Sequence, residues 1–310
     1  MIIPKESEYI ENIPGHNRFD MPDGVVRVTG GNGGEAFLIL GSEKTAIYDT
    51  GMACFKNNLI SNIHEVLDPL NRKLDYIFIS HTHYDHMGAL PYLIEEYPNV
   101  KVCAAPKATR VFSSETAKNT ITDLGEKARK LYNIDDVVIK ADPLRVDIEL
   151  TDGMEISLGK ETVVAYEAKG HTDCSLCYMI QPDKIFFTNE SVGIQETNDY
   201  ISCSPLKSFE ECLKTTKRFA QFDIDTLIMM HYGSLPKWYI PEFFRRYQDE
   251  LIWEEGLIRR CIKNGMTDQE VSDEFDKFCW NERRELNHPY PAYHLNTMII
   301  IERVRREMQI

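Results

Sequence analysis

The sequence predicts an α/β protein in which two β-sheet layers have helices outside them, followed by a helical appendage. Three observations support this prediction. The first half alternates short β-like runs with helical stretches, the segment from about 137 to 188 is rich in short strands, and the chain after Pro236 has helical periodicity. With 310 residues, 43% of them hydrophobic and 27% charged, the chain has the composition of a globular protein whose core needs no disulfides.

The first half is expected to follow the order β-β-β-α-β-α-β. Its predicted strands cover residues 25–28, 36–40, 45–49, 75–80 and 101–104, and its predicted helices cover about 56–67 and 88–97. A glycine-rich segment, residues 30–34, lies between the first two strands. A phosphate-binding loop must open a helix, whereas this segment leads into a strand, so we interpret it as a flexible hairpin connection.

The second half is expected to be richer in strands. They are predicted over residues 145–150, 155–158, 162–168, 176–180 and 184–187, with turn residues between them. A helix over 209–220 and a buried strand over 226–230 complete the two layers. In the appendage, helices are predicted over 241–263, 267–278 and 293–308, with a capping box at Thr267 and Glu270 and a helix stop at Gly265.

The charge balance restricts the class of partner. A net charge of −14 repels polyanions, so we expect a small-molecule substrate rather than nucleic acid or a membrane surface, and the oligomeric state stays open. The first residues contain no basic stretch followed by an apolar run, and no stretch reaches about 18 apolar residues, so we expect a cytoplasmic protein. The eight cysteines are expected to be reduced, and the pair Cys174 and Cys177 is interpreted as inert because it leads into a strand.

The strongest functional signal directly follows the predicted strand that ends at Ser80. Within six positions the chain carries His81, His83, Asp85 and His86. In a loop between a strand and a helix, these side chains can converge on one point or divide between two. Imidazole nitrogen and carboxylate oxygen suit zinc, iron or manganese, so the sequence predicts a metal site here.

Three more candidate ligands follow other predicted strands. His171 comes after the strand 162–168, Glu190 comes after 184–187, and His231 directly follows 226–230. Each alone would be unremarkable, because a histidine at a strand end usually makes an ordinary hydrogen bond. Their joint order with the histidine cluster is what favours a functional reading.

That joint order resembles the metallo-β-lactamase fold superfamily over roughly residues 25–235. The matching motifs are Asp49-Thr50-Gly51, the cluster 81–86, Gly170-His171-Thr172, a carboxylate at a strand end, and finally His231. The resemblance implies a four-layer αββα sandwich over residues 1–235 and a helical cap over residues 236–310 that lines the substrate cleft. It also implies two divalent metal ions at one edge between the sheets, with zinc expected and iron or manganese as alternatives.

The resemblance further implies a role for each site residue. The first metal would be bound by His81, His83 and His171, and the second by Asp85, His86 and His231. Asp49 would orient ligands by accepting their hydrogen bonds, and Tyr84 and Tyr232 would contact the substrate.

Two positions depart from the family pattern. Asn189-Glu190 stands where most members have Gly-Asp, so Glu190 is one methylene longer than the usual bridging carboxylate; it can bridge both metals, bind one of them or not ligate. Asp173 and Cys174 replace the pair that often follows the His-Thr motif. We interpret them as a plain turn, and a role for either in the site stays open.

The implied activity is that of a binuclear metallohydrolase. A metal-bound hydroxide would attack a small thioester, ester or lactone, with Asp85 orienting the nucleophile as the catalytic residue. The layout resembles glyoxalase II-like and quinolone-signalling-type thioesterases, which carry helices after the last metal histidine. One alternative is an iron-dependent oxidoreductase on the same ligands, of the dioxygenase or flavodiiron type, although flavodiiron members typically have Glu at the position of His83. A hydrolase of small phosphodiesters and a non-catalytic protein that keeps its metal site are the others.

Overall fold

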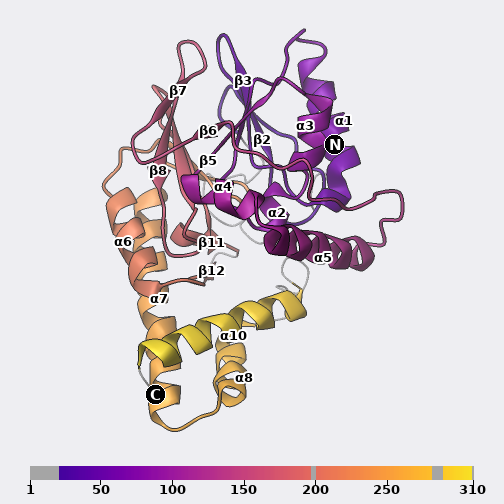
Figure 1. The fold of residues 1–310 in the computed structure, drawn as a ribbon. Coiled ribbons are helices and arrows are strands. Elements are labelled where there is room, and N and C mark those ends of the chain that lie inside the picture. Colours follow the sequence, from indigo (N-terminus) through magenta and orange to yellow (C-terminus); the bar gives the residue numbers. More distant parts are fainter. Residues whose placement is uncertain (1–20, 197–199, 281–288, 309–310) are drawn as a thin grey trace.

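The computed structural model describes residues 21–196, 200–280 and 289–308, and its centre is a pair of six-stranded sheets (Figure 1). The first sheet has the order β1 (Val25–Arg27), β2 (Phe37–Leu40), β3 (Thr45–Tyr48), β4 (Tyr76–Phe78), β5 (Lys101–Ala104) and β6 (Ile148–Glu149). The second has the order β14 (Ser234–Pro236), β13 (Thr226–Ile228), β10 (Ile185–Phe187), β9 (Leu176–Gln181), β8 (Thr162–Glu167) and β7 (Glu155–Ser157). A small separate ladder pairs β11 (Ile194–Gln195) with β12 (Ile201–Ser202).

Strand direction brings the functional ends of several strands to one edge. In the first sheet β3, β4, β5 and β6 are parallel. In the second sheet β10 and β13 are parallel, and β8 runs the same way because both β8 and β10 are antiparallel to β9. The carboxyl ends of β4, β8, β10 and β13 therefore lead into the loops that carry the candidate ligands.

Helices cover the outer faces of both sheets. Against the first sheet pack α1 (Lys56–Leu67) and α3 (Leu90–Glu96), and α6 (Phe209–Phe219) packs against the second. Near the ligand edge lie the short elements η2 (Ala53–Phe55), α2 (Tyr84–Met87) and η3 (Glu190–Val192), with α4 (Pro106–Phe112) and α5 (Glu115–Leu131). The order of layers is helix, sheet, sheet, helix, which confirms the αββα prediction.

Alternation along the strands divides the interior into two clusters. On β3, Ile47 faces the helices α1 and α3, while its neighbour Tyr48 faces the second sheet. The cluster between the sheets also takes in Phe78 and Phe187. Since both faces of the central strands are buried, these strands are almost continuously apolar.

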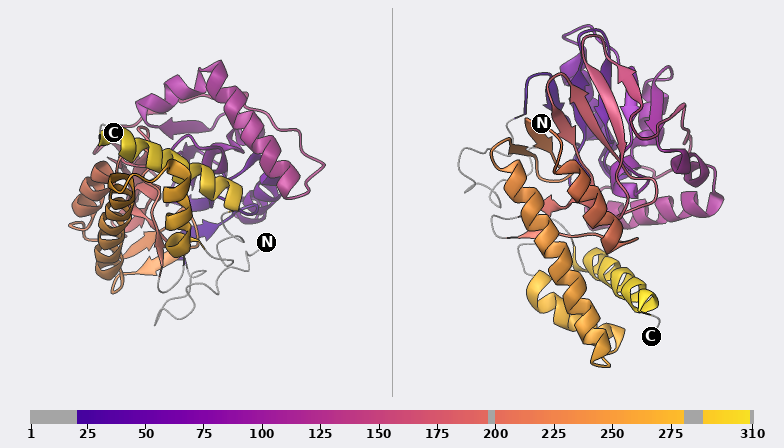
Figure 2. Two further views of the ribbon diagram at one scale, coloured as in Figure 1. Left: turned by 90° about the horizontal axis from the view of Figure 1, so that it is seen from below. Right: turned by 90° about the vertical axis from the view of Figure 1, so that its left-hand side faces the viewer.

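The three predicted C-terminal helices are present as α7 (Ile240–Lys263), α8 (Asp268–Cys279) and α10 (Tyr290–Glu307). The capping box at Thr267 and Glu270 forms as predicted, and Gly265 has a positive φ of 80° directly after the end of α7. In both views of Figure 2, and in Figure 1, α8, α10 and the far end of α7 extend away from the sheets. Phe243 and Tyr247 of α7 are nevertheless fully buried in the cluster between the sheets, and the domain boundary at residue 235 stays a prediction.

Two features of the first half bear on the sequence predictions. Residues 30–34 connect the antiparallel strands β1 and β2, which confirms the hairpin interpretation. The helices α4 and α5 were not predicted, because the residues that they bury include Ala108, Gly125 and Ala128, which are too small to mark an apolar face.

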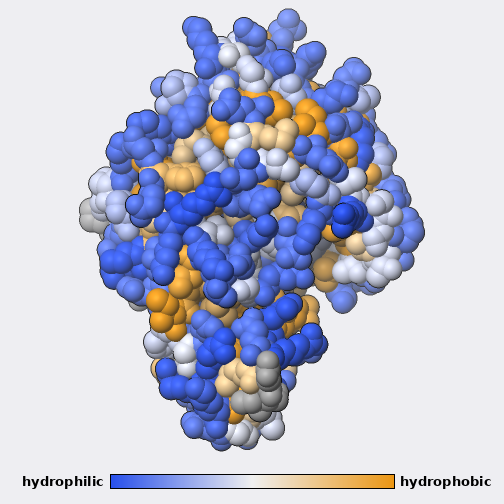
Figure 3. All heavy atoms as spheres, turned by 60° about the vertical axis from the view of Figure 1, so that its left-hand side comes forward, coloured by the Kyte–Doolittle hydropathy of each residue, from blue (hydrophilic) through white to orange (hydrophobic). Residues whose placement is uncertain are grey.

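The surface is mainly polar. On the face shown in Figure 3, hydrophilic residues predominate, and hydrophobic ones appear only in small separate patches. Within the described ranges, none of the helices combines the length and the apolar character that crossing a membrane requires.

Candidate metal centre

The predicted ligands come together at the edge where β4, β8, β10 and β13 end. His81 lies in the turn after β4, and His83 immediately precedes α2, which carries Asp85 and His86. From the second sheet come His171 after β8, Glu190 at the start of η3, and His231 after β13. The structure places these seven side chains in two neighbouring groups.

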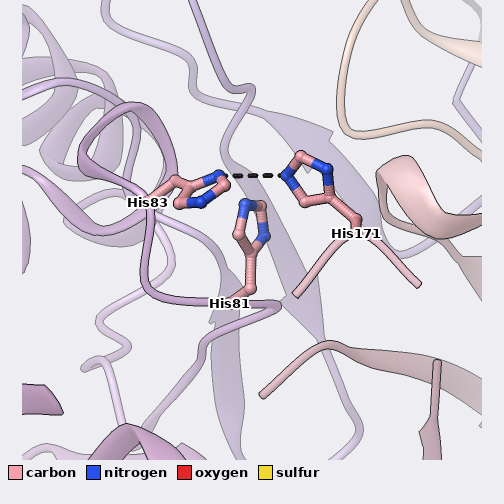
Figure 4. A group of neighbouring side chains, drawn as sticks. All are labelled: His81, His83 and His171. Carbon is pink, nitrogen blue, oxygen red and sulfur yellow. Dashed lines mark hydrogen bonds between the residues drawn. The ribbon is translucent and has the colours of Figure 1, made fainter. Parts of the chain in front are cut away.

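The first group consists of His81, His83 and His171, with one nitrogen of each within 4.8 Å of the others. Figure 4 shows the three rings facing one another, and His171 Nε2 lies 3.0 Å from His83 Nδ1. Burial lowers the pKa of all three imidazoles, that of His83 to about 4. They are therefore neutral at pH 7, which is the protonation state in which imidazole binds a metal.

The second group consists of Asp85, His86, Glu190 and His231. Glu190 Oε1 lies 2.7 Å from His86 Nε2 and 3.5 Å from His231 Nε2. Its other oxygen, Oε2, lies 3.7 Å from His81 Nδ1 and 3.9 Å from His171 Nε2. One carboxylate thus presents an oxygen to each group, which is the arrangement that a bridging ligand needs.

The carboxylates and imidazoles of this edge shift one another's pKa values. Burial alone would raise the pKa of Glu190, but His81 and His86 hold it well below its usual range. Burial alone would lower the pKa of His86, but Glu190 and Asp85 raise it well above the ordinary value. The two carboxylates thus stabilise positive charge where they meet, whether it is a proton on His86 or a metal ion.

Hydrogen bonds fix the orientation of three of the histidine rings. His86 Nδ1 lies 2.9 Å from Asp49 Oδ2, His171 Nδ1 lies 2.7 Å from the carbonyl of Ser204, and His231 Nδ1 lies 3.0 Å from the carbonyl of Gly33. A ring that donates from Nδ1 presents its Nε2 lone pair to a metal. Each ring therefore turns Nε2 towards the ligand groups.

Asp49 is itself held in place. Its carboxylate is fully buried and accepts bonds from the backbone N–H of Ser80, at 2.7 Å, and from the Ser80 hydroxyl, at 2.6 Å. The structure thus gives Asp49 the orienting contacts that the sequence predicted. Ser80 and the carbonyls of Gly33 and Ser204 were missed; the position of Ser80 directly before His81 was a usable signal for it, whereas carbonyl contacts leave no trace in residue identity.

The residues fit a pair of metal ions. Three polar atoms of the site, His81 Nε2, His86 Nε2 and Glu190 Oε2, are buried without a hydrogen-bond partner. Each such atom costs about 1–3 kcal/mol unless something else coordinates it. With five imidazoles and two carboxylates in the two groups, the donor set is one that transition metals favour.

Residues 29–231 match the family described as the metallo-beta-lactamase superfamily. This chain belongs to the metallo-beta-lactamase superfamily. The match covers well over half of the chain and ends on His231, the last candidate ligand. It confirms the family that the motif order indicated, while the ligand role of each residue stays a prediction.

Curated relatives share part of this metallo-beta-lactamase region. Rubredoxin-oxygen oxidoreductase of Megalodesulfovibrio gigas is 30% identical over 175 residues, which are 56% of this chain and 37% of that protein. Nitric oxide reductase of Moorella thermoacetica is 29% identical over 159 residues, which are 51% of this chain and 33% of that protein. The matched part thus spans little more than a third of either relative's own length.

Solved structures of the superfamily show the same fold. A metallo-beta-lactamase family protein from Thermus thermophilus aligns with a TM-score of 0.64 at 14% identity, covering 94% of this chain and 95% of that one. An archaeal superfamily protein from Sulfolobus tokodaii aligns with a TM-score of 0.55 at 21% identity, covering 74% and 86%. The first alignment extends well beyond residues 29–231, into the C-terminal helices.

The remaining predicted residues lie around the two groups. Tyr232, next to His231, has a positive φ of 64° and is half-buried, whereas Tyr84 in α2 packs against the cluster beneath the first sheet. A substrate contact for either stays a prediction. Cys174 and Cys177 are buried free thiols, and neither joins a candidate ligand group in the described ranges, in line with the inert interpretation.

Proposed function

We propose that this chain is a binuclear metal-dependent hydrolase that cleaves a small thioester, ester or lactone. The observation that carries the proposal is the donor set, in which five imidazoles surround a single carboxylate that faces both groups. Imidazole donors suit zinc, and three neutral histidines leave a zinc ion with a free position for water or substrate. Two bound ions would supply an activated water and a Lewis acid for the substrate carbonyl.

Asp85 is the residue placed to handle the proton of the attacking water. Its side chain is 23% exposed, against 7% for Glu190, so it is the carboxylate of the site that solvent reaches. Burial alone would raise the pKa of Asp85, but the nearby imidazole of His86 lowers it well below the usual range. Asp85 is therefore an ionised hydrogen-bond acceptor at neutral pH, able to orient a water and to accept its proton.

The second candidate is an iron-dependent oxidoreductase, and the similarity to rubredoxin-oxygen oxidoreductase favours it. The imidazole of His83 weighs against it. His83 occupies the position where flavodiiron members typically have Glu, so the site carries one negative charge less. Two ferric ions would bring six positive charges against the two carboxylates of the groups, whereas two divalent ions bring four.

The test is metal content combined with activity. Protein purified without oxygen or chelator is measured by elemental mass spectrometry, then assayed with acyl thioesters, esters, lactones and a phosphodiester, and separately for oxygen consumption with a chemical reductant. We expect two zinc or manganese ions per chain and hydrolysis of one substrate class. Iron with reductant-dependent oxygen consumption and no hydrolysis would overturn the proposal in favour of the oxidoreductase.

Two histidine variants test the ligand assignment. His83→Ala should lose one metal equivalent and most of the hydrolysis. The matched control is His64→Ala, because His64 is a surface residue that pairs with Asp68 and Glu96 outside the site. Unchanged metal content in His83→Ala, or an equal loss in His64→Ala, would contradict the assignment.

A further inference from the structure

Three fully buried tyrosines donate hydrogen bonds next to the candidate ligands. They are Tyr48, Tyr178 and Tyr247, and all are among the largest side chains with essentially no solvent exposure. Each hydroxyl is bonded to a backbone carbonyl that lies within two residues of a predicted metal ligand. A core that needed only apolar volume would be served equally well by phenylalanine, so the hydroxyls require an explanation.

Tyr48 and Tyr178 form a reciprocal pair between the sheets. Tyr48, on β3 of the first sheet, donates at 2.6 Å to the carbonyl of Thr188, which follows β10 of the second sheet. Tyr178, on β9 of the second sheet, donates at 2.8 Å to the carbonyl of Ile79, which follows β4 of the first sheet. Each bond thus crosses to the strand end that leads into ligands of the opposite sheet.

The two rings also contact each other, edge to face, with centroids 5.9 Å apart. The Thr188 carbonyl lies two residues before Glu190, and the Ile79 carbonyl lies two residues before His81. The pair therefore sets the separation between the loop that carries Glu190 and the loop that carries His81.

Tyr247 supplies the third bond, from helix α7. Its hydroxyl lies 3.4 Å from the carbonyl of Glu190 and 3.2 Å from that of Ser191. The Ser191 hydroxyl oxygen in turn accepts the backbone N–H of His171 at 3.1 Å. The ring of Tyr247 packs on Gly193, where an added Cβ would lie 2.4 Å from it, so this contact holds the whole turn that carries Glu190.

We propose that Tyr48, Tyr178 and Tyr247 are positioning residues, which hold the loops of the two sheets at the separation that binds both metals. The inference rests on the metal centre of the proposed function and is independent of the reaction. Strand-end carbonyls lie beyond the β-ladders, so these hydroxyls replace the bonds that a ladder would otherwise provide. Through Tyr247, the C-terminal helical segment takes part in shaping the metal site.

The test compares single Tyr→Phe variants, which keep the ring and remove only the hydroxyl. Tyr92→Phe is the matched control, because the Tyr92 hydroxyl donates at 2.5 Å to the carbonyl of Val138, in a segment without predicted ligands. For each variant, zinc affinity is measured by chelator competition, and the unfolding of the metal-free protein is followed in urea.

Tyr48→Phe, Tyr178→Phe and Tyr247→Phe should each bind zinc about 10-fold or more weakly, whereas Tyr92→Phe should stay within about twofold of the wild type. All four should lose similar stability without metal, because each loses one buried hydrogen bond. Unchanged affinity in the three site variants, or an equal loss in Tyr92→Phe, would overturn the inference. A wild-type protein that binds two metals and hydrolyses nothing would refute the proposed function alone, and one without metal affinity would refute both.

Discussion

Replacement of Asp49 by asparagine tests how strongly the buried carboxylate orients the site. Oδ2 accepts bonds from both the Ser80 hydroxyl and His86 Nδ1, and Oδ1 accepts the backbone N–H of Ser80. Asparagine keeps only one of the two oxygens. In either orientation of the amide, its NH2 group therefore meets a group that donates to Asp49 in the native site.

The structure sets the size of the expected effect. Asp49 is completely buried, so the mismatched donor has no water to bond, and its desolvation costs about 1–3 kcal/mol. A further 1.5–3 kcal/mol or so is lost with the charge-assisted hydrogen bond. We therefore expect the free energy of unfolding to fall by about 3–5 kcal/mol.

Metal binding should suffer as well. If His86 instead accepts a hydrogen bond from the new amide at Nδ1, its proton moves to Nε2, the atom that faces Glu190. We therefore expect Asp49→Asn to weaken one of the two metals by about 10- to 100-fold. Chelator competition measures this affinity, and urea unfolding of the metal-free protein measures the stability. Two metals bound with wild-type affinity would refute the orienting role of Asp49.

Three other predictions follow from the described contacts. Removal of metal with a chelator should lower the free energy of unfolding by about 2.7 kcal/mol relative to protein at a metal concentration of 100 Kd; a melting temperature that does not respond to chelator would contradict the metal centre. Gly193→Ala should destabilise by at least about 2 kcal/mol in urea, because Gly193 has a φ of 87° and its Cβ would lie 2.4 Å from the ring of Tyr247; Gly153→Ala, which has a φ of 80° but nothing within 4 Å, separates the clash from the backbone strain. Burial raises the pKa of Asp152, but its two bonds to Arg218, both at 2.8 Å, lower it overall; the stability from this pair is present above the unfolded pKa of about 3.9 and lost as the pH falls through the lower folded value. Asp152→Asn should therefore cost less than about 1 kcal/mol at pH 7 and nothing at pH 2, and an equal loss at both values would show that the charge is not involved.

The sequence was most informative where chemistry is concentrated in consecutive residues. His81, His83, Asp85 and His86 come from one strand-to-helix turn, so their proximity follows from the chain itself. His171, Glu190 and His231 were less obvious, and they were found because carboxyl ends of strands that run the same way share an edge. Both arguments rest on local pattern and strand direction, which one sequence contains.

The supporting contacts were beyond such reasoning. The carbonyl of Gly33 orients His231 across 198 positions of the sequence, and any residue type carries a carbonyl. Tyr48 and Tyr178 appear in the sequence as ordinary strand aromatics, and only the packing of one sheet on the other reveals where their hydroxyls reach. The helix α5 was missed for a related reason, since its buried face includes a glycine and an alanine that pack closely rather than an apolar stripe.

The division of the two sheets along the chain has a consequence for how the protein assembles. The first sheet is built from residues 25–149 and the second from residues 155–236. The first ligand group takes His81 and His83 from one half and His171 from the other, and the second group is divided in the same way. Neither half can therefore form a metal site alone. Metal uptake during refolding should report the docking of the two halves rather than the formation of either, and a bound ion acts as a late cross-link between parts of the chain that can each collapse without it.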